Sequence, residues 1–145
     1  MDEILVRLAG SSLTGISFRT ECIEAIAELP GCDWCGIYRL ELDHLILDAY
    51  VGAPTDHERI PVGQGVCGTA VKTGENQIVD DVSVLDNYLS CSISTKSEIV
   101  VLIRSKQDGK TILGQIDIDS HQAARFGETD ETFLTRLAEM IAARW

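Results

Sequence analysis

The pattern of apolar positions predicts helices near both ends of the chain. In residues 17–29, SFRTECIEAIAEL, apolar side chains recur every three or four positions and charged side chains take the other side, as in an amphipathic helix. The segment ETDETFLTRLAEMIAARW has the same period. We expect this helix to begin at Thr129 or Asp130, because both residue types cap helix N-termini. Residues 1–9 predict one more short helix.

Between the helices the pattern changes to that of two β-hairpins. Residues 34–40 and the segment HLILDAYVG are apolar runs of strand length, and Glu41–Asp43 is the expected connection. The runs SEIVVLIRS and KTILGQIDIDS flank KQDGK, whose Asp-Gly pair favours a tight turn.

The middle of the chain predicts shorter elements. VCGTAVKTG is expected to be a short helix that ends at Gly74, and NQIVDDV is expected to be a short strand. APTDHERIPVGQG is expected to be a loop, and residues 83–96 form a long polar stretch.

The order of these elements predicts one α+β domain that spans residues 1–145. Long helices at both ends of a mostly antiparallel sheet of about five or six strands favour a layered arrangement. A chain of 145 residues, with 45% hydrophobic and 24% charged side chains, is long enough for one core.

Charge and hydropathy argue against several classes of function. The formal net charge is −11, from 23 acidic and 12 basic residues, whereas nucleic acids and anionic membranes attract basic surfaces. No run approaches the roughly 18 apolar residues of a membrane span, and the acidic start lacks the layout of a secretory signal. We therefore expect a cytoplasmic protein that binds neither nucleic acid nor membranes.

The chain has five cysteines, an odd number that argues against a disulfide framework. Cys22 belongs to the apolar stripe of its helix and is expected to be buried. Cys32 and Cys35 form a CxxC motif, but the residues that follow predict a strand, along which positions three apart face opposite sides. No second CxxC or HxxxH motif supplies the further ligands that zinc needs. We interpret this pair as structural, and we expect no metal ion and no cofactor.

Trp34 and Tyr38 share one face of the first predicted strand, with Gly36 between them. This spacing predicts a flat aromatic wall with a notch at the glycine. The wall either packs in the core or lines a slot for an apolar ligand, and both interpretations stay open.

Two further cysteines lie in segments suited to chemistry. Cys67 falls at the start of the short helix, where free N–H groups and the helix dipole favour a thiolate. Gly65 and Gly68 let the backbone approach a bound group closely. Cys91 lies in the long polar stretch, and loops of this length inside a compact domain tend to be functional lids.

Asp117 and Asp119 face the same side of the last predicted strand, and Ile116 and Ile118 face the other. Two carboxylates side by side are costly unless a cation lies near them. They either form a site with Glu98, on the strand expected to pair with theirs, or end their strand in solvent. We favour the site.

Four stretches in this order resemble one branch of a known family. DWCGIYRL, RIPVGQGVCGTAV, the segment from Cys91 to Val101 and GQIDIDS resemble the free methionine-(R)-sulfoxide reductases among the GAF domain proteins. The resemblance covers about Ser17 to Ala142. It implies a GAF-like fold, with terminal helices on one face of the sheet and a pocket under a loop and short helix on the other. It also implies reduction of free methionine sulfoxide, with recycling by thioredoxin or another thiol reductant.

The resemblance also implies roles for individual residues. Cys91 corresponds to the nucleophile of the family. Glu98 and Asp117 correspond to the residues that handle the sulfoxide oxygen. The other implied substrate contacts are Asp119, for the ammonium group, and Trp34 and Tyr38, for the methyl-sulfur end.

The chain departs from the family pattern at two positions. His57 stands two residues before the RIP element, where the family has a cysteine that forms a disulfide with the nucleophile, and Tyr88 stands where a histidine is usual. Cys67 is then the candidate substitute for the resolving cysteine, and an external thiol is another. The alternative is a non-catalytic GAF domain that binds a small molecule or senses redox state through a Cys67–Cys91 bond.

GAF domains often pair through their terminal helices, so a homodimer is expected. The apolar stripes of residues 133–141 and 4–8 are the candidate contact surfaces. Burial of these stripes against each other within one chain is the alternative.

Overall fold

The structure is a computed structural model of the chain, and it describes residues 1–86, 88–89 and 93–145. Cys91, the expected nucleophile, lies outside the described residues. Within the described ranges, six strands form one antiparallel sheet in the order β3-β2-β1-β6-β5-β4. The strands are β1 (Trp34–Glu41), β2 (His44–Val51), β3 (Arg59–Pro61), β4 (Gln77–Val79), β5 (Ser97–Arg104) and β6 (Ile112–Ser120).

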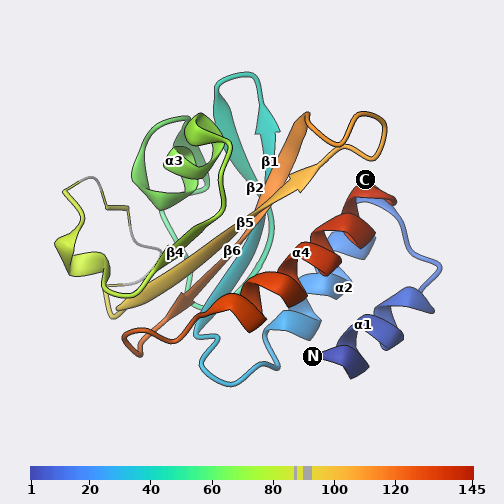
Figure 1. Cartoon of the computed structure of the whole chain (residues 1–145), viewed down its shortest axis with the longest axis horizontal. Coiled ribbons are helices and arrows are strands. Elements are labelled where there is room, and N and C mark those ends of the chain that lie inside the picture. The colour runs from blue at the N-terminus through green and yellow to red at the C-terminus, as the bar shows by residue number, and fades with distance from the viewer. Residues whose placement is uncertain (87, 90–92) are drawn as a thin grey trace.

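Helices cover both faces of this sheet. They are α1 (Asp2–Ala9), α2 (Gly15–Ile26), α3 (Gly65–Thr73) and α4 (Glu128–Ala142), with one turn of 3₁₀-helix at Val82–Val84. Figure 1 shows α1, α2 and α4 on one side of the sheet and α3 on the other. The predicted α+β layers, with the terminal helices on one face and the short helix on the other, are therefore confirmed.

Each face of the sheet has its own apolar core. The terminal helices cover a core that includes Phe18, Ile37 and Leu137. The core under α3 includes Trp34, Tyr38 and other residues of the central strands. The second core is the one in which the candidate site residues lie.

Both predicted hairpins form, and one strand was missed. β1 pairs with β2 across the expected connection, and β5 pairs with β6. The missed strand is β3, which pairs with residues His44–Ile46 of β2, although the sequence predicted a loop there. Three residues are too few to show an alternating pattern, and the proline among them is typical of an edge strand as well as of a loop.

The start of α4 differs from the prediction. Gly127 is the N-cap residue, so neither Thr129 nor Asp130 is. Asp130 lies in the first turn, and its Oδ2 accepts a hydrogen bond from the Gly127 N–H at 3.0 Å. The aspartate thus stabilises the helix start from inside the helix, as the acidic member of a capping box does.

The apolar stripes of the terminal helices pack within the chain. Ile4, Leu5 and Leu8 of α1 are buried in the same core as the apolar residues of α4. These stripes are therefore unavailable as the expected dimer surfaces. The homodimer stays a prediction, but it would have to use other surfaces. Among the described residues, no helix is both long and apolar enough to cross a membrane.

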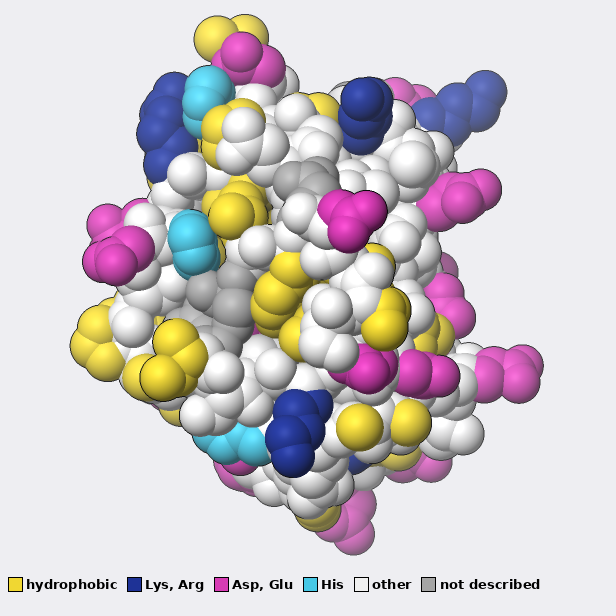
Figure 2. Space-filling view, turned by 90° about the vertical axis from the view of Figure 1, so that its left-hand side faces the viewer, with side chains coloured by type: hydrophobic (Ala, Val, Ile, Leu, Met, Phe, Trp, Pro, Cys, Tyr) yellow, Lys and Arg dark blue, Asp and Glu magenta, His cyan; other side chains and the backbone are white. Residues whose placement is uncertain are grey.

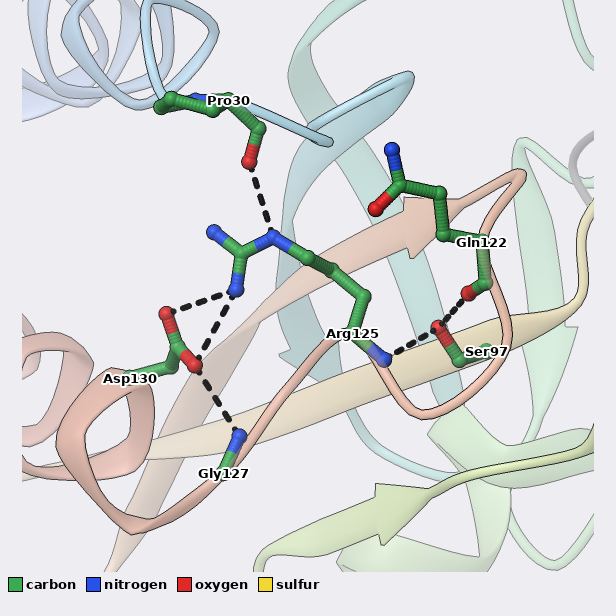
Figure 3. Close-up of polar contacts among 6 residues, drawn as sticks. All are labelled: Pro30, Ser97, Gln122, Arg125, Gly127 and Asp130. Atoms are coloured by element: carbon green, nitrogen blue, oxygen red, sulfur yellow. Dashed lines mark hydrogen bonds and ion pairs between the residues drawn. The ribbon is translucent and has the colours of Figure 1, made fainter.

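Arg125 ties three segments together beside the start of β5 (Figure 3). Its Nε donates to the Pro30 carbonyl at 2.9 Å, and its Nη1 forms an ion pair with Asp130 at 3.2 Å. The Arg125 N–H donates to Ser97 Oγ, which itself donates to the Gln122 carbonyl at 2.5 Å. The network fixes the first residue of β5, and Glu98 follows directly.

Replacing Arg125 with methionine is expected to lower the free energy of unfolding by about 1.5–3 kcal/mol, the range for hydrogen bonds to charged groups. The Arg125 side chain of the ion pair is 22% exposed and that of Asp130 is 16% exposed. The matched control is Arg7→Met, because the Arg7–Glu28 pair is more than half exposed and should contribute about 1 kcal/mol or less. Urea unfolding measures the loss of unfolding free energy in each variant. Equal losses in the two variants would contradict the stabilising role of the Arg125 network.

Candidate functional site

Three carboxyl groups lie together on the α3 side of the sheet. Asp117 and Asp119 face this side of β6, while Ile116 and Ile118 belong to the core under the terminal helices. Glu98 of β5 is the register partner of Asp119. The exposed fractions of Glu98, Asp117 and Asp119 are 2%, 1% and 1%, so the alternative of a strand end in solvent is wrong, and the functional role of these acids stays a prediction.

Cys67 joins these acids from α3. Its Sγ donates a hydrogen bond to Asp117 Oδ2 at 3.3 Å and lies 3.9 Å from Glu98 Oε1. Ligand atoms of all three residues lie within 4.8 Å of one another. Cys67, Glu98 and Asp117 are called the acid–thiol cluster below.

Close packing of α3 places Cys67 at the cluster. The Gly68 carbonyl oxygen accepts a 2.9 Å hydrogen bond from the Gly63 N–H. A Cβ atom on Gly68 would lie 2.6 Å from the Pro61 carbonyl oxygen. This glycine permits a close approach of α3 to the backbone that leads into it, and the predicted approach to a bound group stays a prediction.

Burial sets the protonation of the two carboxyl groups in the cluster. It raises the pKa of Glu98 well above its usual range, and the negative charges of Asp117 and Asp119 raise it further, while the Tyr88 hydroxyl opposes the shift. Burial also raises the pKa of Asp117 to about 6, against the lowering effect of hydrogen bonds with Cys67 and Glu98. Glu98 is therefore the member on which burial and neighbouring charge favour the proton, and Asp117 is the acceptor.

The arrangement favours the protonated form of Cys67. The position at the start of α3 is the predicted one, but the sulfur faces two carboxyl groups and acts as a hydrogen-bond donor to Asp117. An ionised carboxylate accepts a thiol proton and repels a thiolate. The expectation of a thiolate at Cys67 is therefore wrong for the protein without a bound cation.

The raised pKa of Asp117 predicts a pH-dependent stability. A carboxyl whose pKa rises from 3.8 unfolded to about 6 folded binds its proton more tightly in the folded state, so stability is lost as the pH rises between these values. The free energy of unfolding of Asp117→Asn relative to wild type should therefore increase by roughly 3 kcal/mol between about pH 3 and pH 7. Urea unfolding in the presence of a chelator measures this difference.

Asp108 provides a control of opposite sign. Hydrogen bonds from Thr111 and Lys110 lower the pKa of this exposed carboxyl to about 2. Its contribution to the free energy of unfolding is therefore lost as the pH falls. Asp108→Asn should be less stable than wild type above about pH 4, with the deficit fading below it. If the stability of both variants relative to wild type changed in the same direction with pH, the raised pKa of Asp117 would be contradicted.

The predicted aromatic wall forms, but its notch is filled. Trp34 and Tyr38 are both buried in the core under α3. A Cβ atom on Gly36 would lie 2.4 Å from Trp34 Cη2, so the indole ring itself covers the glycine. The ring is held by a 3.1 Å hydrogen bond from its Nε1 to the Ala53 carbonyl and by stacking on Tyr50.

His57 lies next to this wall through its backbone. The Tyr38 hydroxyl donates to the His57 carbonyl at 2.9 Å. The position where the resemblance expects a resolving cysteine is therefore adjacent to the aromatic side of the site.

Three other cysteines lie in or against the core under the terminal helices: Cys22, Cys35 and Cys32. Cys22 is fully buried, and burial raises its pKa to about 12. Cys35 is fully buried as well, and a hydrogen bond with Cys32 followed by burial raises its pKa. The argument that Cys32 and Cys35 face opposite sides is wrong, because β1 begins at Trp34 and Cys32 precedes it. The interpretation of the motif as structural stays the favoured one.

Sequence reasoning missed two polar residues near the acids. Thr95 Oγ1 donates to Asp119 Oδ2 at 3.3 Å, and nothing in the polar stretch distinguishes this threonine. Gln115 is fully buried, and its amide has no hydrogen-bond partner in the part of the chain that the structure describes. Gln115 lies two residues before Asp117 and therefore on the same strand face, so the strand period alone predicts that it lies near the acids.

The cluster lies beneath the surface of the face that α3 helps to form. Figure 2 shows this face, where hydrophobic side chains gather near the centre beside the residues that are not described. Leu89 packs on Gly65 at the start of α3. Cys67 is only 5% exposed, so the thiol is shielded from solvent.

Known proteins resemble this chain over most of its length. A sequence profile of the GAF domain matches residues 19–145. The chain is 40% identical over 113 residues to the free methionine-R-sulfoxide reductase of Escherichia coli, which is 78% of this chain and 66% of that protein. It is 45% identical over 112 residues to the protein of that name from Saccharomyces cerevisiae, at 75% and 61% coverage. The structure of free methionine-R-sulfoxide reductase from Neisseria meningitidis with its substrate matches at a TM-score of 0.87 and 32% identity, covering 99% of this chain and 84% of that chain.

Proposed function

Since the chain belongs to the GAF domain family, we propose that it reduces free methionine-(R)-sulfoxide to methionine. Relatives with this activity in their names support the proposal. The observation on this chain that carries it is the acid–thiol cluster, buried beside Asp119 and the aromatic wall. A proton donor, an anionic contact and an apolar surface are the three features that this zwitterionic sulfoxide needs.

Each feature corresponds to one part of the substrate. The sulfoxide oxygen lies at Glu98 and Asp117, where the carboxyl proton of Glu98 is available. The ammonium group lies at Asp119, whose carboxylate Thr95 contacts. The methyl-sulfur end packs on the wall of Trp34 and Tyr38, because thioether-like groups pack well on aromatic rings.

Cys91 is the proposed nucleophile. Its sulfur attacks the sulfoxide sulfur while Glu98 gives a proton to the oxygen, which makes the oxygen a better group to transfer. In the net step Cys91–SH and the sulfoxide become Cys91–SOH and methionine. The substrate sulfur gains two electrons, and the cysteine sulfur loses two.

A second thiol then regenerates the enzyme. It attacks the sulfenic acid, forms a disulfide with Cys91 and releases water, and a dithiol such as thioredoxin reduces the disulfide. Cys67 is the proposed resolving thiol because it lies at the acids on which the substrate oxygen is placed. With Cys67→Ser, turnover by thioredoxin should fall, and mass spectrometry of the oxidised wild type should find Cys67 linked to Cys91.

Turnover of the two sulfoxide epimers tests the proposed activity. Purified, chelator-treated protein with a dithiol reductant should consume the free R epimer and leave the S epimer and peptide-bound sulfoxide unchanged. Cys91→Ser should abolish the reaction. Persistence of the R epimer, under conditions in which the Escherichia coli enzyme consumes it, would overturn the proposal.

The histidine at position 57 favours a second candidate function. Without a cysteine there, the chain could be a small-molecule-binding or redox-sensing GAF domain. Binding without catalysis is indicated if free methionine sulfoxide raises the melting temperature of both wild type and Cys91→Ser while neither consumes it.

Replacing Gly36 with alanine is expected to raise KM roughly tenfold, which corresponds to about 1.4 kcal/mol of binding free energy. The new methyl group overlaps the Trp34 ring at 2.4 Å, so the indole must leave the wall that holds the substrate. Steady-state kinetics measure the change, and kcat should change less. Gly127→Ala is the control, because no atom lies within 4 Å of its added Cβ, and an unchanged KM in Gly36→Ala would contradict the role of the wall.

A further inference from the structure

The acid–thiol cluster combines one sulfur and two carboxyl groups from three separate elements. Cys67 comes from α3, Glu98 from β5 and Asp117 from β6. Their exposed fractions are 5%, 2% and 1%. The ligand atoms lie within 4.8 Å of one another, so the fold brings the three groups to one point that is shielded from solvent.

The spacing of these atoms fits a tetrahedral metal ion. An ion about 2.3 Å from a sulfur and about 2.1 Å from an oxygen separates the two ligands by roughly 3.6 Å at the tetrahedral angle. The distances from Cys67 Sγ to Asp117 Oδ2 and Glu98 Oε1 are 3.3 Å and 3.9 Å, on either side of this value. The Glu98 and Asp117 oxygens lie within 4.8 Å of each other and must come to roughly 3.4 Å when a tetrahedral ion binds.

The carboxyl groups in the cluster lack a cation. Glu98 Oε2 and Asp117 Oδ1 are buried, and within residues 1–86, 88–89 and 93–145 neither atom has a hydrogen-bond partner. No lysine or arginine in these ranges forms an ion pair with Glu98 or Asp117. A buried carboxyl group either stays protonated, as burial favours for Glu98, or is paired with a cation or coordinates a metal when it ionises.

We propose that Cys67, Glu98 and Asp117 form a binding site for a thiophilic divalent cation, with Zn²⁺ as the best match. Three protein ligands leave one position of the tetrahedron open to water or another small ligand. The sulfur selects against Mg²⁺ and Ca²⁺, which need more oxygen ligands than the cluster offers. On binding, the thiol proton of Cys67 and the carboxyl proton of Glu98 leave to solvent, and the sulfur and the carboxylate oxygen bond to the metal.

This site differs from the expectation of no metal, and the reason lies in tertiary structure. Motifs of closely spaced ligands do not reveal this site, because Glu98 and Asp117 lie 31 and 50 residues after Cys67 in the sequence. If the proposed reductase function holds, the metal occupies the position of the sulfoxide oxygen. Zn²⁺ would then inhibit competitively, so that metal availability regulates the same pocket.

Co²⁺ is the probe, because its bond to a thiolate gives a charge-transfer absorption band and Zn²⁺ does not. The reduced, chelator-treated chain is titrated with Co²⁺ and then with Zn²⁺, without substrate. We expect one equivalent to give the thiolate band and tetrahedral d–d bands, and Zn²⁺ to displace them. Calorimetry with Zn²⁺ gives the affinity.

Single substitutions identify the ligands. Cys67→Ser should abolish the charge-transfer band and weaken Zn²⁺ binding by more than the roughly 10–100-fold seen for loss of second-shell partners. Glu98→Gln should keep the band but weaken binding. Cys32→Ser and Cys91→Ser should keep the charge-transfer band and the Zn²⁺ affinity, since neither the CxxC pair nor the proposed nucleophile is assigned as a ligand.

Two outcomes overturn the proposal: no stoichiometric Co²⁺ spectrum, or a thiolate band that survives in Cys67→Ser. Failure of the metal site is distinguishable from failure of the proposed function. The metal titration contains no substrate, and the reductase assay contains a chelator. A protein that reduces the sulfoxide but binds no Co²⁺ retains its function and lacks only the metal site.

Discussion

Replacing Glu98 with glutamine is expected to lower kcat for free methionine-(R)-sulfoxide by roughly 10²–10⁴-fold, the range that a positioned proton donor supplies. Burial and the charges of Asp117 and Asp119 raise the pKa of this carboxyl well above its usual range, so it keeps its proton to a higher pH than an ordinary glutamate. Glutamine keeps the size of the side chain and an N–H donor for the oxygen. It has no proton to transfer, so kcat should fall far more than KM rises.

The pH profile separates proton transfer from a structural effect. In the wild type, kcat should decline as the pH rises through the raised pKa of Glu98, since only the protonated carboxyl is active. The residual activity of Glu98→Gln should lack this decline. Glu75→Gln, at an exposed position, is the matched control and should leave both kcat and the profile unchanged. A Glu98→Gln enzyme with wild-type kcat would end the proposal that this residue is the acid.

The candidate acids were largely predictable because strands have a period of two. Asp117 and Asp119 alternate with isoleucines, and this alone places them on one face. The pairing of the last two strands then brings Glu98 opposite Asp119. Neither step needs information beyond a hairpin and its register.

The contact that completes the cluster was not predictable in this way. Cys67 reaches Asp117 across 50 residues of sequence, through the packing of a short helix on a sheet rather than through any periodic pattern. The protonation of the thiol follows from that contact. A helix start alone favours a thiolate, and only the structure shows that two carboxyl groups face it.

Elements with few residues account for the errors in the fold. β3 has three residues, too few to show alternation. The start of α4 was misplaced because Asp130 caps through an interior position, where its residue type gives the same signal as a true N-cap. The indole of Trp34 fills the notch at Gly36 because side-chain rotation decides which space stays open, and sequence spacing carries no information about rotamers.

Replacing Gly68 with alanine is expected to lower the free energy of unfolding by about 3 kcal/mol, the upper part of the range for overpacking. The added Cβ would lie 2.6 Å from the Pro61 carbonyl oxygen and 2.8 Å from the Gly63 nitrogen. Both are backbone atoms, and the Gly63 N–H is already bonded to the Gly68 carbonyl. Neither contact can be relieved by turning a side chain, so α3 itself must move away from the segment that precedes it.

The displacement of α3 also carries a consequence for the site, because Cys67 directly precedes Gly68. Thermal unfolding should show a melting temperature lower by roughly 10 °C, and the Sγ contact with Asp117 should be lost along with stability. Gly10→Ala is the matched control, since its added Cβ meets only an ordinary 3.5 Å contact and an exposed change of this kind alters stability by about 0.5 kcal/mol or less. Equal melting temperatures for the two variants would show that α3 tolerates the methyl group, and the close approach of the helix would then not be what holds the thiol against the acids.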